Sequence, residues 1–183
     1  MPGVNLIRTA MVIERWLKLV YTPFQMKLYF LRHADALPDQ DDAVRALSQT
    51  GKKEAQSLGR FLKNAGVAFD AAFTSPLVRA RQTAEIVLKI CGHISPAKLD
   101  LTEALLNETS HKTFERWLKE LPEAKKVLLV GHEPTLSERI RRLLTIASAE
   151  RLTLPKGGLA CIESEDRQTG CLKFFISPKI LAE

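Results

Sequence analysis

Four side chains in this sequence have the types and positions to do chemistry on an anion, and each lies at or just after the end of a short apolar run. They are Arg32 and His33 in "LYFLRHADA", Arg79 in "SPLVRARQTA" and His132 in "VGHEP". Neither arginine nor histidine is easily buried without a partner, so the adjacent pair after "LYFL" implies that something lies opposite it. Guanidinium groups bind phosphate oxygens through paired, charge-assisted hydrogen bonds. The set therefore favours a pocket for a compact dianion, such as a phosphoryl or sulfuryl group.

A histidine in such a pocket is a candidate nucleophile. Like charge from the arginines disfavours the imidazolium form of His33, which leaves one ring nitrogen free near neutral pH. In-line attack on phosphorus spreads charge over three equatorial oxygens, and Arg32, Arg79 and a donating His132 are expected to stabilise that charge. No Asp, His or Cys cluster in the sequence has the spacing of metal ligands, so neither a metal nor another cofactor is expected.

Apolar runs alternate with segments of helical periodicity along the chain from Lys27 onward. Strands are expected at 27–31, 70–74, 97–101 and 126–130, and the helices that follow them at 48–66, 75–90, 110–121 and 131–144. Two closing strands, at 157–164 and 171–177, are expected to pair antiparallel around the turn "DRQTG". This alternation is typical of an α/β domain, a three-layer sandwich whose mostly parallel sheet has helices on both faces.

Local signals predict how three of these helices begin, end or pack. Ser48 is a candidate N-cap for the first helix and Gly66 is its C-terminal stop, while Ser75 with Pro76 makes the candidate N-terminus of the second. In the third helix, Trp117 shares an apolar stripe with its neighbours one turn away. We therefore assign its indole to the core and not to a ligand site.

In a sheet of this class, ligands bind beyond the carboxyl ends of the strands. Arg32 and His33 follow the first strand, Arg79 lies one turn into the helix after the second, Glu103 follows the third and His132 follows the fourth. Taken singly, each has an ordinary explanation: a strand-end histidine is more often a loop residue, and a lone helix arginine is usually on the surface. Glu103 is explained equally well as a solvated carboxylate and as a general acid. Their common position along one edge favours a site.

Four segments resemble, in order, the motifs of the histidine phosphatase superfamily, also called phosphoglycerate mutase-like. "LRHADA" is similar to its Arg-His-Gly signature, "LSQTGKKEA" to its Leu-Thr-x-x-Gly pattern, "SPLVRARQTA" to its Ser-Pro-Leu-x-Arg-Ala-x-Gln-Thr-Ala block and "VGHEP" to its second-histidine motif. The resemblance spans nearly all of residues 27–177. It implies a phosphoglycerate mutase-like fold in which His33 is the phosphorylated nucleophile and Arg32, Arg79 and His132 hold the phosphoryl group. It also implies that water hydrolyses the phosphohistidine intermediate without a metal cofactor.

Two departures from the family pattern bear on the substrate. Ala34 stands where the signature has glycine, and no large insertion follows the second strand, where phosphoglycerate mutases and acid phosphatases carry substrate-binding or proton-donor segments. The short chain, "RHADA" and the closing segment resemble the small bacterial SixA-type phosphohistidine phosphatases, which implies a phosphohistidine in a signalling protein as the substrate. His93 and His111 match no motif and are expected to be bystanders.

Two alternative functions remain open. One is a phosphatase of the same superfamily that acts on the phosphate ester of a small metabolite. The other is a non-catalytic module that binds phosphate in the same pocket. The binding module is disfavoured because it would need only the arginines, whereas His33 and His132 are both present.

Composition is that of an ordinary globular protein. With 183 residues, of which 45% are hydrophobic and 26% charged, the chain is long enough for one well-buried core. The net charge of +6 comes with pairs such as Lys52 and Lys53, which suit a solvated helix face, and without interleaved aromatic residues. No nucleic-acid partner is therefore expected. Three cysteines, an odd number without metal-ligand spacing, favour a reducing, cytoplasmic location.

Residues 1–26 form an extension that is apolar enough to suggest a signal or membrane segment. Four charged residues interrupt it: Arg8, Glu14, Arg15 and Lys18. A membrane-spanning helix needs about 18 or more apolar residues, and no basic leader precedes a clean apolar core, so neither a membrane span nor an export signal is expected. Because Met26 directly precedes the first strand, the extension is either an upstream over-assignment of the start site or a helix that packs on the histidine phosphatase domain at 27–183.

Overall fold

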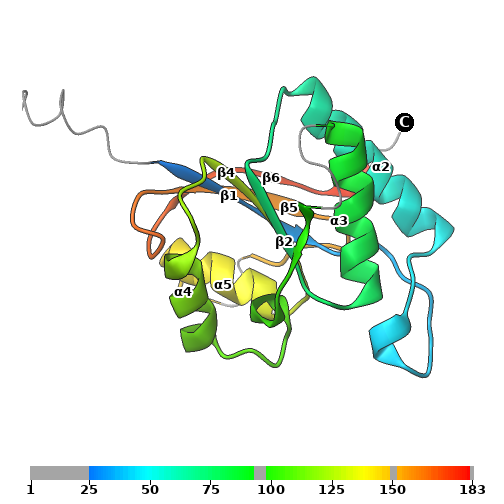
Figure 1. Ribbon diagram of the computed structural model, residues 1–183, viewed down its shortest axis with the longest axis horizontal. Coiled ribbons are helices and arrows are strands. Elements are labelled where there is room, and N and C mark those ends of the chain that lie inside the picture. The colour runs from blue at the N-terminus through cyan, green and yellow to red at the C-terminus, as the bar shows by residue number, and fades with distance from the viewer. Residues whose placement is uncertain (1–24, 93–97, 149–151, 182–183) are drawn as a thin grey trace, which may run out of the picture.

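The computed structural model describes residues 25–92, 98–148 and 152–181, which form a six-stranded sheet between two layers of helices (Figure 1). The strands are β1 (Met26–Arg32), β2 (Ala71–Thr74), β3 (Asp100–Leu101), β4 (Lys126–Gly131), β5 (Leu159–Ser164) and β6 (Cys171–Ile176). Their order across the sheet is β3-β2-β4-β1-β5-β6. The first four in that order are parallel, and β5 is antiparallel to both of its neighbours. The predicted three-layer α/β class with a mostly parallel sheet is confirmed.

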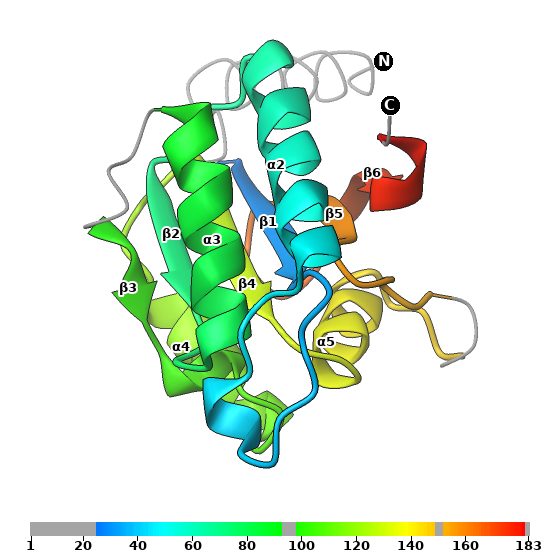
Figure 2. The ribbon, with the colours of Figure 1, turned by 90° about the vertical axis from the view of Figure 1, so that its right-hand side faces the viewer.

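Alternation along β1 builds a separate core on each face of the sheet. Leu28 and Phe30 join one buried cluster with side chains of α4 and α5, whereas Tyr29 and Leu31 join another with side chains of α2 and α3. The helices are α2 (Gln49–Asn64), α3 (Val78–Cys91), α4 (His111–Glu120) and α5 (Thr135–Leu143). Figure 2 shows α2 and α3 together on one face. Because the central strands β1 and β4 are covered on both faces, their sequences are continuous apolar runs.

The start of α2 is fixed by its cap and by a glycine. Ser48 Oγ accepts a hydrogen bond from Gly51 N–H at 3.0 Å, and Gly66 follows the helix end with a φ of 65°, as predicted for both positions. Gly51 is required for a further reason, because a Cβ at this position would lie 1.9 Å from the carbonyl oxygen of Asp35. Only glycine therefore lets the loop after β1 pack directly against the first turn of α2.

The predicted capping of α3 by Ser75 is wrong. The helix begins at Val78, and its N-cap, Leu77, makes no side-chain capping bond. The hydroxyl of Ser75 instead lies 2.5 Å from His132 Nε2. Ser75 is fully buried, and a buried polar group needs a hydrogen-bond partner. His132 Nε2 is that partner, so the hydroxyl does not cap the helix as the sequence pattern predicts.

The other predicted elements occur with small shifts in their ends. β5 and β6 pair antiparallel as expected, and β3 is shorter than expected. α5 begins at Thr135, later than expected, because Gly131 still belongs to β4 and Glu133 and Pro134 form a turn ahead of the helix. Trp117 packs edge-on against Phe73, with ring centroids 5.3 Å apart, which confirms that its indole packs against the core.

Some expectations concern residues that the structure does not describe. The extension up to residue 24 and His93 both lie outside the described residues, so the two interpretations of the extension stay predictions. Cys91, Cys161 and Cys171 are all free thiols. None of the helices in the described part of the chain is long and apolar enough to cross a membrane.

Candidate phosphoryl-binding site

The carboxyl ends of β1, β2 and β4 bring the predicted residues to one edge of the sheet. Arg32 pairs with Gly131 in the register of β1 and β4, so His33 and His132 leave adjacent strands at the same level. A backbone hydrogen bond of 3.0 Å from His33 N–H to Gly131 O holds the two segments together. Figure 2 shows these strand ends beside the first turn of α3, which carries Arg79.

The two ring nitrogens of His33 have different surroundings within a side chain that is only 8% exposed. Nδ1 lies 2.8 Å from the carbonyl oxygen of Ala34, and because a carbonyl only accepts, Nδ1 carries the proton of the neutral ring. Nε2 keeps its lone pair, to which Arg79 Nε donates at 3.3 Å. The pKa of His33 is lowered to about 4, first by burial and then by the charges of Arg79, Arg32 and Arg45. The ring is therefore neutral near pH 7, and burial contributes more than the like charge that the sequence suggests.

His132 lies opposite His33, with ring centroids 5.0 Å apart. Its Nε2 contacts the hydroxyl of Ser75, and its buried Nδ1 has no hydrogen-bond partner among the described residues. Burial lowers the pKa of His132 to about 3, and the charges of His33 and Arg79 act in the same direction. When the Ser75 hydroxyl donates to Nε2, the neutral ring carries its proton on Nδ1, which makes Nδ1 an unused hydrogen-bond donor.

Both predicted arginines are at the site, and protein groups hold part of each guanidinium. Arg32 Nη1 donates to the carbonyl of Leu154 at 2.8 Å, while its buried Nε has no partner in the described part of the chain. Arg79 donates from Nη1 to the backbone carbonyl of Asp42 at 2.6 Å and from Nη2 to the Asp42 carboxylate at 2.8 Å. The anion that Arg79 binds in this structure is therefore the side chain of Asp42.

Sequence reasoning missed three residues that shape the site. Asp42 also accepts a hydrogen bond from Arg45 Nη1 at 2.9 Å, and Arg45 and Arg79 together lower the pKa of the Asp42 carboxyl. Thr83 Oγ1 accepts from Ala34 N–H at 3.1 Å and donates to the Arg79 carbonyl at 2.7 Å, which ties the segment after His33 to α3. The available signals were the three-residue spacing of "DAVR" and the position of Thr83 one helical turn after Arg79.

Two features remain to be placed at this edge: the side chain of Glu103, and any group of residues that could hold a metal ion. Glu103 opens a short 3-10 helix after β3, and its side chain is exposed. Within the residues that the structure describes, its carboxylate makes no hydrogen bond or ion pair, whereas its backbone carbonyl accepts from Leu106 N–H and Thr109 Oγ1. The structure thus brings the two arginines and two histidines together without holding Glu103 against them. No group of three or more His, Cys, Asp or Glu side chains in the described ranges is placed to hold a metal ion.

Comparison with known proteins finds one family and a shared fold. Residues 28–124 match the family model of the histidine phosphatase superfamily (branch 1). An uncharacterized protein of Picosynechococcus is 34% identical over 145 residues, which cover 76% of this chain and 86% of the relative. The protein histidine phosphatase SixA complexed with tungstate has a TM-score of 0.77 at 24% identity, covering 86% of this chain and 100% of that one. SixA from Agrobacterium tumefaciens has a TM-score of 0.70 at 24% identity, covering 84% and 98%. The expected SixA-like, phosphoglycerate mutase-like fold is confirmed.

Proposed function

The chain belongs to the histidine phosphatase superfamily, and on that premise we propose that it is a phosphatase that carries the phosphoryl group on His33 Nε2. One observation carries the proposal. The proton of the neutral ring is held on Nδ1 by the Ala34 carbonyl, so Nε2 keeps its lone pair, which accepts a hydrogen bond from buried Arg79 at 3.3 Å until a phosphoryl oxygen takes over that donor. A phosphoryl dianion bound by Arg79 would lie against that lone pair, in position for attack.

The first step transfers the phosphoryl group from the substrate to His33. Nε2 attacks phosphorus, the bond from phosphorus to the leaving group breaks, and the leaving group keeps that electron pair and takes up a proton. Charge develops on the three equatorial oxygens. The buried Nδ1 of His132 and Nε of Arg32, which lack partners in the described part of the chain, are the donors that we assign to two of these oxygens. Arg79 is assigned to the third.

Water completes the reaction. It attacks the phosphorus of phospho-His33, the P–N bond breaks, and Nε2 recovers its lone pair. Inorganic phosphate leaves with one proton of the water, and the other passes to solvent, which offsets the proton taken up by the leaving group. In this scheme the guanidinium and imidazole groups supply the charge stabilisation, so we propose that no metal ion is required. We expect activity to survive treatment with a chelator. Loss of activity that only an added divalent ion restores would contradict this part of the proposal.

We propose phosphohistidine in a protein as the substrate. Imidazole is a good leaving group that needs little help from a general acid, which agrees with the exposed, unpartnered carboxylate of Glu103. The connection from β2 to α3 is limited to residues 75–77, too short to enclose a small substrate. Leu37, Val44 and Leu101 are each more than half exposed and lie on the loop after β1 and at the end of β3, at this same edge. Exposed apolar side chains around a polar site suit a protein partner.

The test compares turnover of a protein phosphorylated on histidine with turnover of a panel of alkyl phosphate esters. We expect the phosphohistidine protein to have the highest kcat/KM, and a phosphoenzyme to be trapped in the wild type and lost in His33→Ala. If an alkyl ester is hydrolysed faster than the phosphohistidine protein, the small-molecule phosphatase replaces this proposal. A phosphoenzyme that persists in His33→Ala would remove the assignment of the nucleophile.

A second comparison tests the apolar rim. Leu37→Glu and Val44→Glu should raise KM for the phosphoprotein several-fold and leave hydrolysis of free phosphohistidine unchanged, because only a protein substrate reaches these side chains. Leu172→Glu is the matched control, since Leu172 is 43% exposed and lies level with Leu28, near the opposite end of the sheet. Equal effects on both substrates would show that the rim does not recognise a protein.

We also propose a cytoplasmic location and no nucleic-acid partner. The three free thiols suit a reducing compartment, since disulfides are rare in the cytosol. The basic residues of α2 that suggested a charged surface, Lys52 and Lys53, lie on its partly or fully exposed face, as expected for solvated lysines.

A further inference from the structure

A second polar pocket, of about 190 Å³, lies between the loop that precedes α4 and the first turns of α5. Its lining residues are Asn107, Glu108, Thr109, Ser110, His111, Thr135, Glu138 and Arg139. None of the four residues assigned to phosphoryl transfer lines it. We propose that this pocket is a second anion site, which binds a small tetrahedral oxyanion such as inorganic phosphate.

Arg139 is the main reason for this inference, because it is a buried cation without an anion. Its side chain is 1% exposed, and it makes no ion pair with any described residue. Nη2 donates to the carbonyls of Leu106, at 3.0 Å, and Thr109, at 3.4 Å, and the guanidinium lies 4.4 Å above the ring of Phe114. Nη1 is buried and has no hydrogen-bond partner in the described part of the chain. Burial lowers the pKa of Arg139 to about 10, against the opposing effect of the Glu138 carboxylate, so the charge persists at neutral pH without an ion-pair partner at contact distance.

His111 supplies a second unpartnered atom on the same pocket. Its Nε2 lies 3.0 Å from Glu115 Oε1, so Nε2 carries the proton of the neutral ring, and its buried Nδ1 has no partner among the described residues. A hydrogen phosphate ion has the complementary group for each of these atoms, since an unprotonated oxygen can accept from Arg139 Nη1 and the P–OH group can donate to His111 Nδ1. His111 is also the first residue of α4, where the helix dipole and free N–H groups favour an anion.

The volume of the pocket limits the ligand to a small ion. At about 190 Å³ it is below the roughly 300–1,000 Å³ of pockets that bind drug-sized molecules, and it holds about six waters at roughly 30 Å³ each. That space suits a tetrahedral oxyanion with some of its hydration. The side chains of Asn107 and Thr135 add neutral donors and acceptors to the wall, and Thr135 Oγ1 already donates to Asn107 Oδ1 at 2.8 Å.

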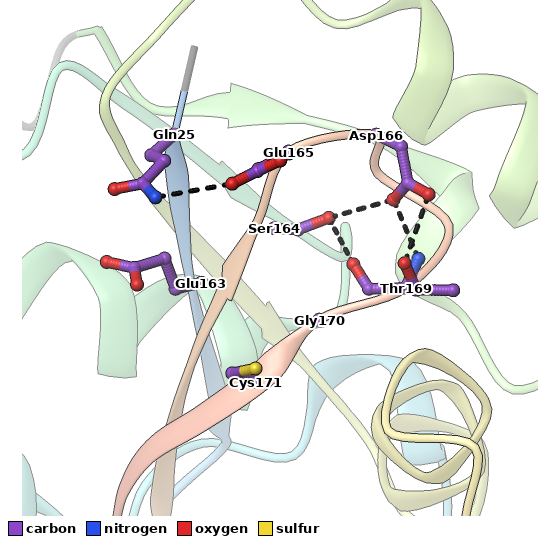
Figure 3. A pocket seen from close by; sticks show the side chains of 8 residues that line it. All are labelled: Gln25, Glu163, Ser164, Glu165, Asp166, Thr169, Gly170 and Cys171. Atoms are coloured by element: carbon purple, nitrogen blue, oxygen red, sulfur yellow. Dashed lines mark hydrogen bonds between the residues drawn. The ribbon is translucent and has the colours of Figure 1, made fainter. Parts of the chain in front are cut away.

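A larger pocket near the start of β1 makes an instructive contrast. It measures about 390 Å³ and is rich in carboxylates, yet most of its polar groups are hydrogen-bonded to one another (Figure 3), and Glu163 is paired with lysines outside it. Glu165 accepts from Gln25, Asp166 accepts from Ser164 and Thr169, and Glu163 lies 3.6 Å from Lys27 and 3.1 Å from Lys173. Its polar atoms therefore need no ligand, whereas the smaller pocket has two buried atoms that do.

Two carboxylates line the smaller pocket, and they allow a test of whether the bound ion is negatively charged. Glu138 is held by Arg142 at 3.1 Å, but Glu108 is exposed and makes no ion pair within the described ranges. A carboxylate near a bound anion weakens binding, so neutralising Glu108 should strengthen it. Replacement of Arg139 or His111 should have the opposite effect.

The experiment is a titration with inorganic phosphate, followed by the backbone amide signals of Ser110 and His111 in NMR spectra of the full chain. It is carried out in the wild type and in Arg32→Ala, which weakens the proposed phosphoryl-transfer site and leaves this pocket intact. We expect saturable shifts of these amides in both proteins. Arg139→Gln should weaken binding about tenfold or more, and His111→Ala about threefold, the scale for losing a charged and a neutral hydrogen bond. Glu108→Gln should tighten it about twofold.

Lys112→Gln is the matched control, because Lys112 is an exposed cation in the first turn of α4 that does not line the pocket. It should leave the affinity within about twofold, the scale of an exposed charge. Shifts that rise linearly with phosphate, or saturable shifts that neither Arg139→Gln nor His111→Ala changes, would overturn the proposal. If Arg139→Gln does not fold, His111→Ala and Glu108→Gln decide the question, since His111 is only partly buried and Glu108 is exposed.

Discussion

The guanidinium of Arg79 donates a hydrogen bond to the proposed nucleophile, so its removal is the clearest test at the scale of one residue. Its Nε contacts the free nitrogen of His33, and both of its terminal nitrogens are turned toward Asp42. Loss of one preorganised donor to a transition state typically costs about a hundredfold or more in rate. We expect Arg79→Ala to lower kcat by that factor while the circular dichroism spectrum stays unchanged.

Arg81→Ala is the matched control for this prediction. Arg81 is on the same helix, half exposed and paired with Glu85 at 3.6 Å. It should leave kcat unchanged, because a surface ion pair on α3 does not reach the substrate. An Arg79→Ala protein as active as the wild type would show that this guanidinium does not act on the phosphoryl group.

Glu103 leads to a prediction that separates two classes of substrate. An alkoxide is a poor leaving group, so a general acid typically contributes about 10²- to 10⁴-fold to the hydrolysis of an ester, whereas imidazole leaves without such help. The Glu103 carboxylate is exposed and held by no neighbour in the described part of the chain. We expect Glu103→Gln to change phosphohistidine turnover by less than about twofold, the effect of an exposed charge, and to depress further a low rate on alkyl esters. Loss of phosphohistidine turnover in this variant would make Glu103 an essential acid.

At the scale of elements, the loop between β1 and α2 supplies the carboxylate that occupies Arg79. Asp42 bridges Arg79 and Arg45, so a phosphoryl group must displace it in order to bind. We expect Asp42→Asn to make inorganic phosphate a stronger competitive inhibitor by up to about fivefold, the scale of an exposed ion pair. Asp39→Asn, an exposed carboxylate in the same loop, is the control and should leave the inhibition constant unchanged. Weaker inhibition in Asp42→Asn would mean that Asp42 orders the binding site.

At the scale of the whole molecule, the two buried histidines predict how stability depends on pH. The pKa values of His33 and His132 are about 4 and 3 in the folded protein, below the ordinary value of 6.5. As the pH falls from 6.5 toward 4, the unfolded chain binds protons that the folded chain does not, so the free energy of unfolding should decrease. Well above pH 6.5 both states hold neutral rings and this contribution is constant. Glu133, whose pKa burial raises, acts in the opposite direction at the acidic end.

Urea unfolding at a series of pH values checks this dependence. Replacement of one ring by a neutral amide, in His33→Asn or His132→Gln, should flatten the decrease between pH 6.5 and 4 by removing one of the two contributions. An identical slope in the wild type and in both variants would mean that these rings titrate normally in the folded state.

The N-terminal extension is also a question about the whole molecule. Met26 is buried with Leu28 in the core between the sheet and α4 and α5, so the described domain uses the chain from that residue onward. We expect a chain shortened to begin at Met26 to remain soluble and to unfold at the same urea concentration as the full chain. If the shortened chain aggregates or unfolds earlier, the extension packs on the domain.

The sequence by itself determined the class of the fold and the four side chains at the centre of the site. Alternating strand and helix periods imply a mostly parallel sheet, and topology then places the carboxyl ends of the parallel strands at one edge, so Arg32, His33 and His132 could be placed together from the sequence. Arg79 followed from the helix that begins at the same edge. These conclusions depend only on local patterns and on their order along the chain.

Only the tertiary structure decided which atoms meet. The Ser75 hydroxyl has the sequence pattern of a helix cap and binds His132 because the fold buries the two together. The Asp42 carboxylate reaches Arg79, and Arg139 is buried without an anion, through contacts between segments far apart in the sequence. His111 matches no sequence motif, yet it lines a pocket for the same reason. Hydrogen bonds form within about 3 Å, and no pattern along one chain specifies such a distance between separate segments, since it is set by how the helices and loops pack on the sheet.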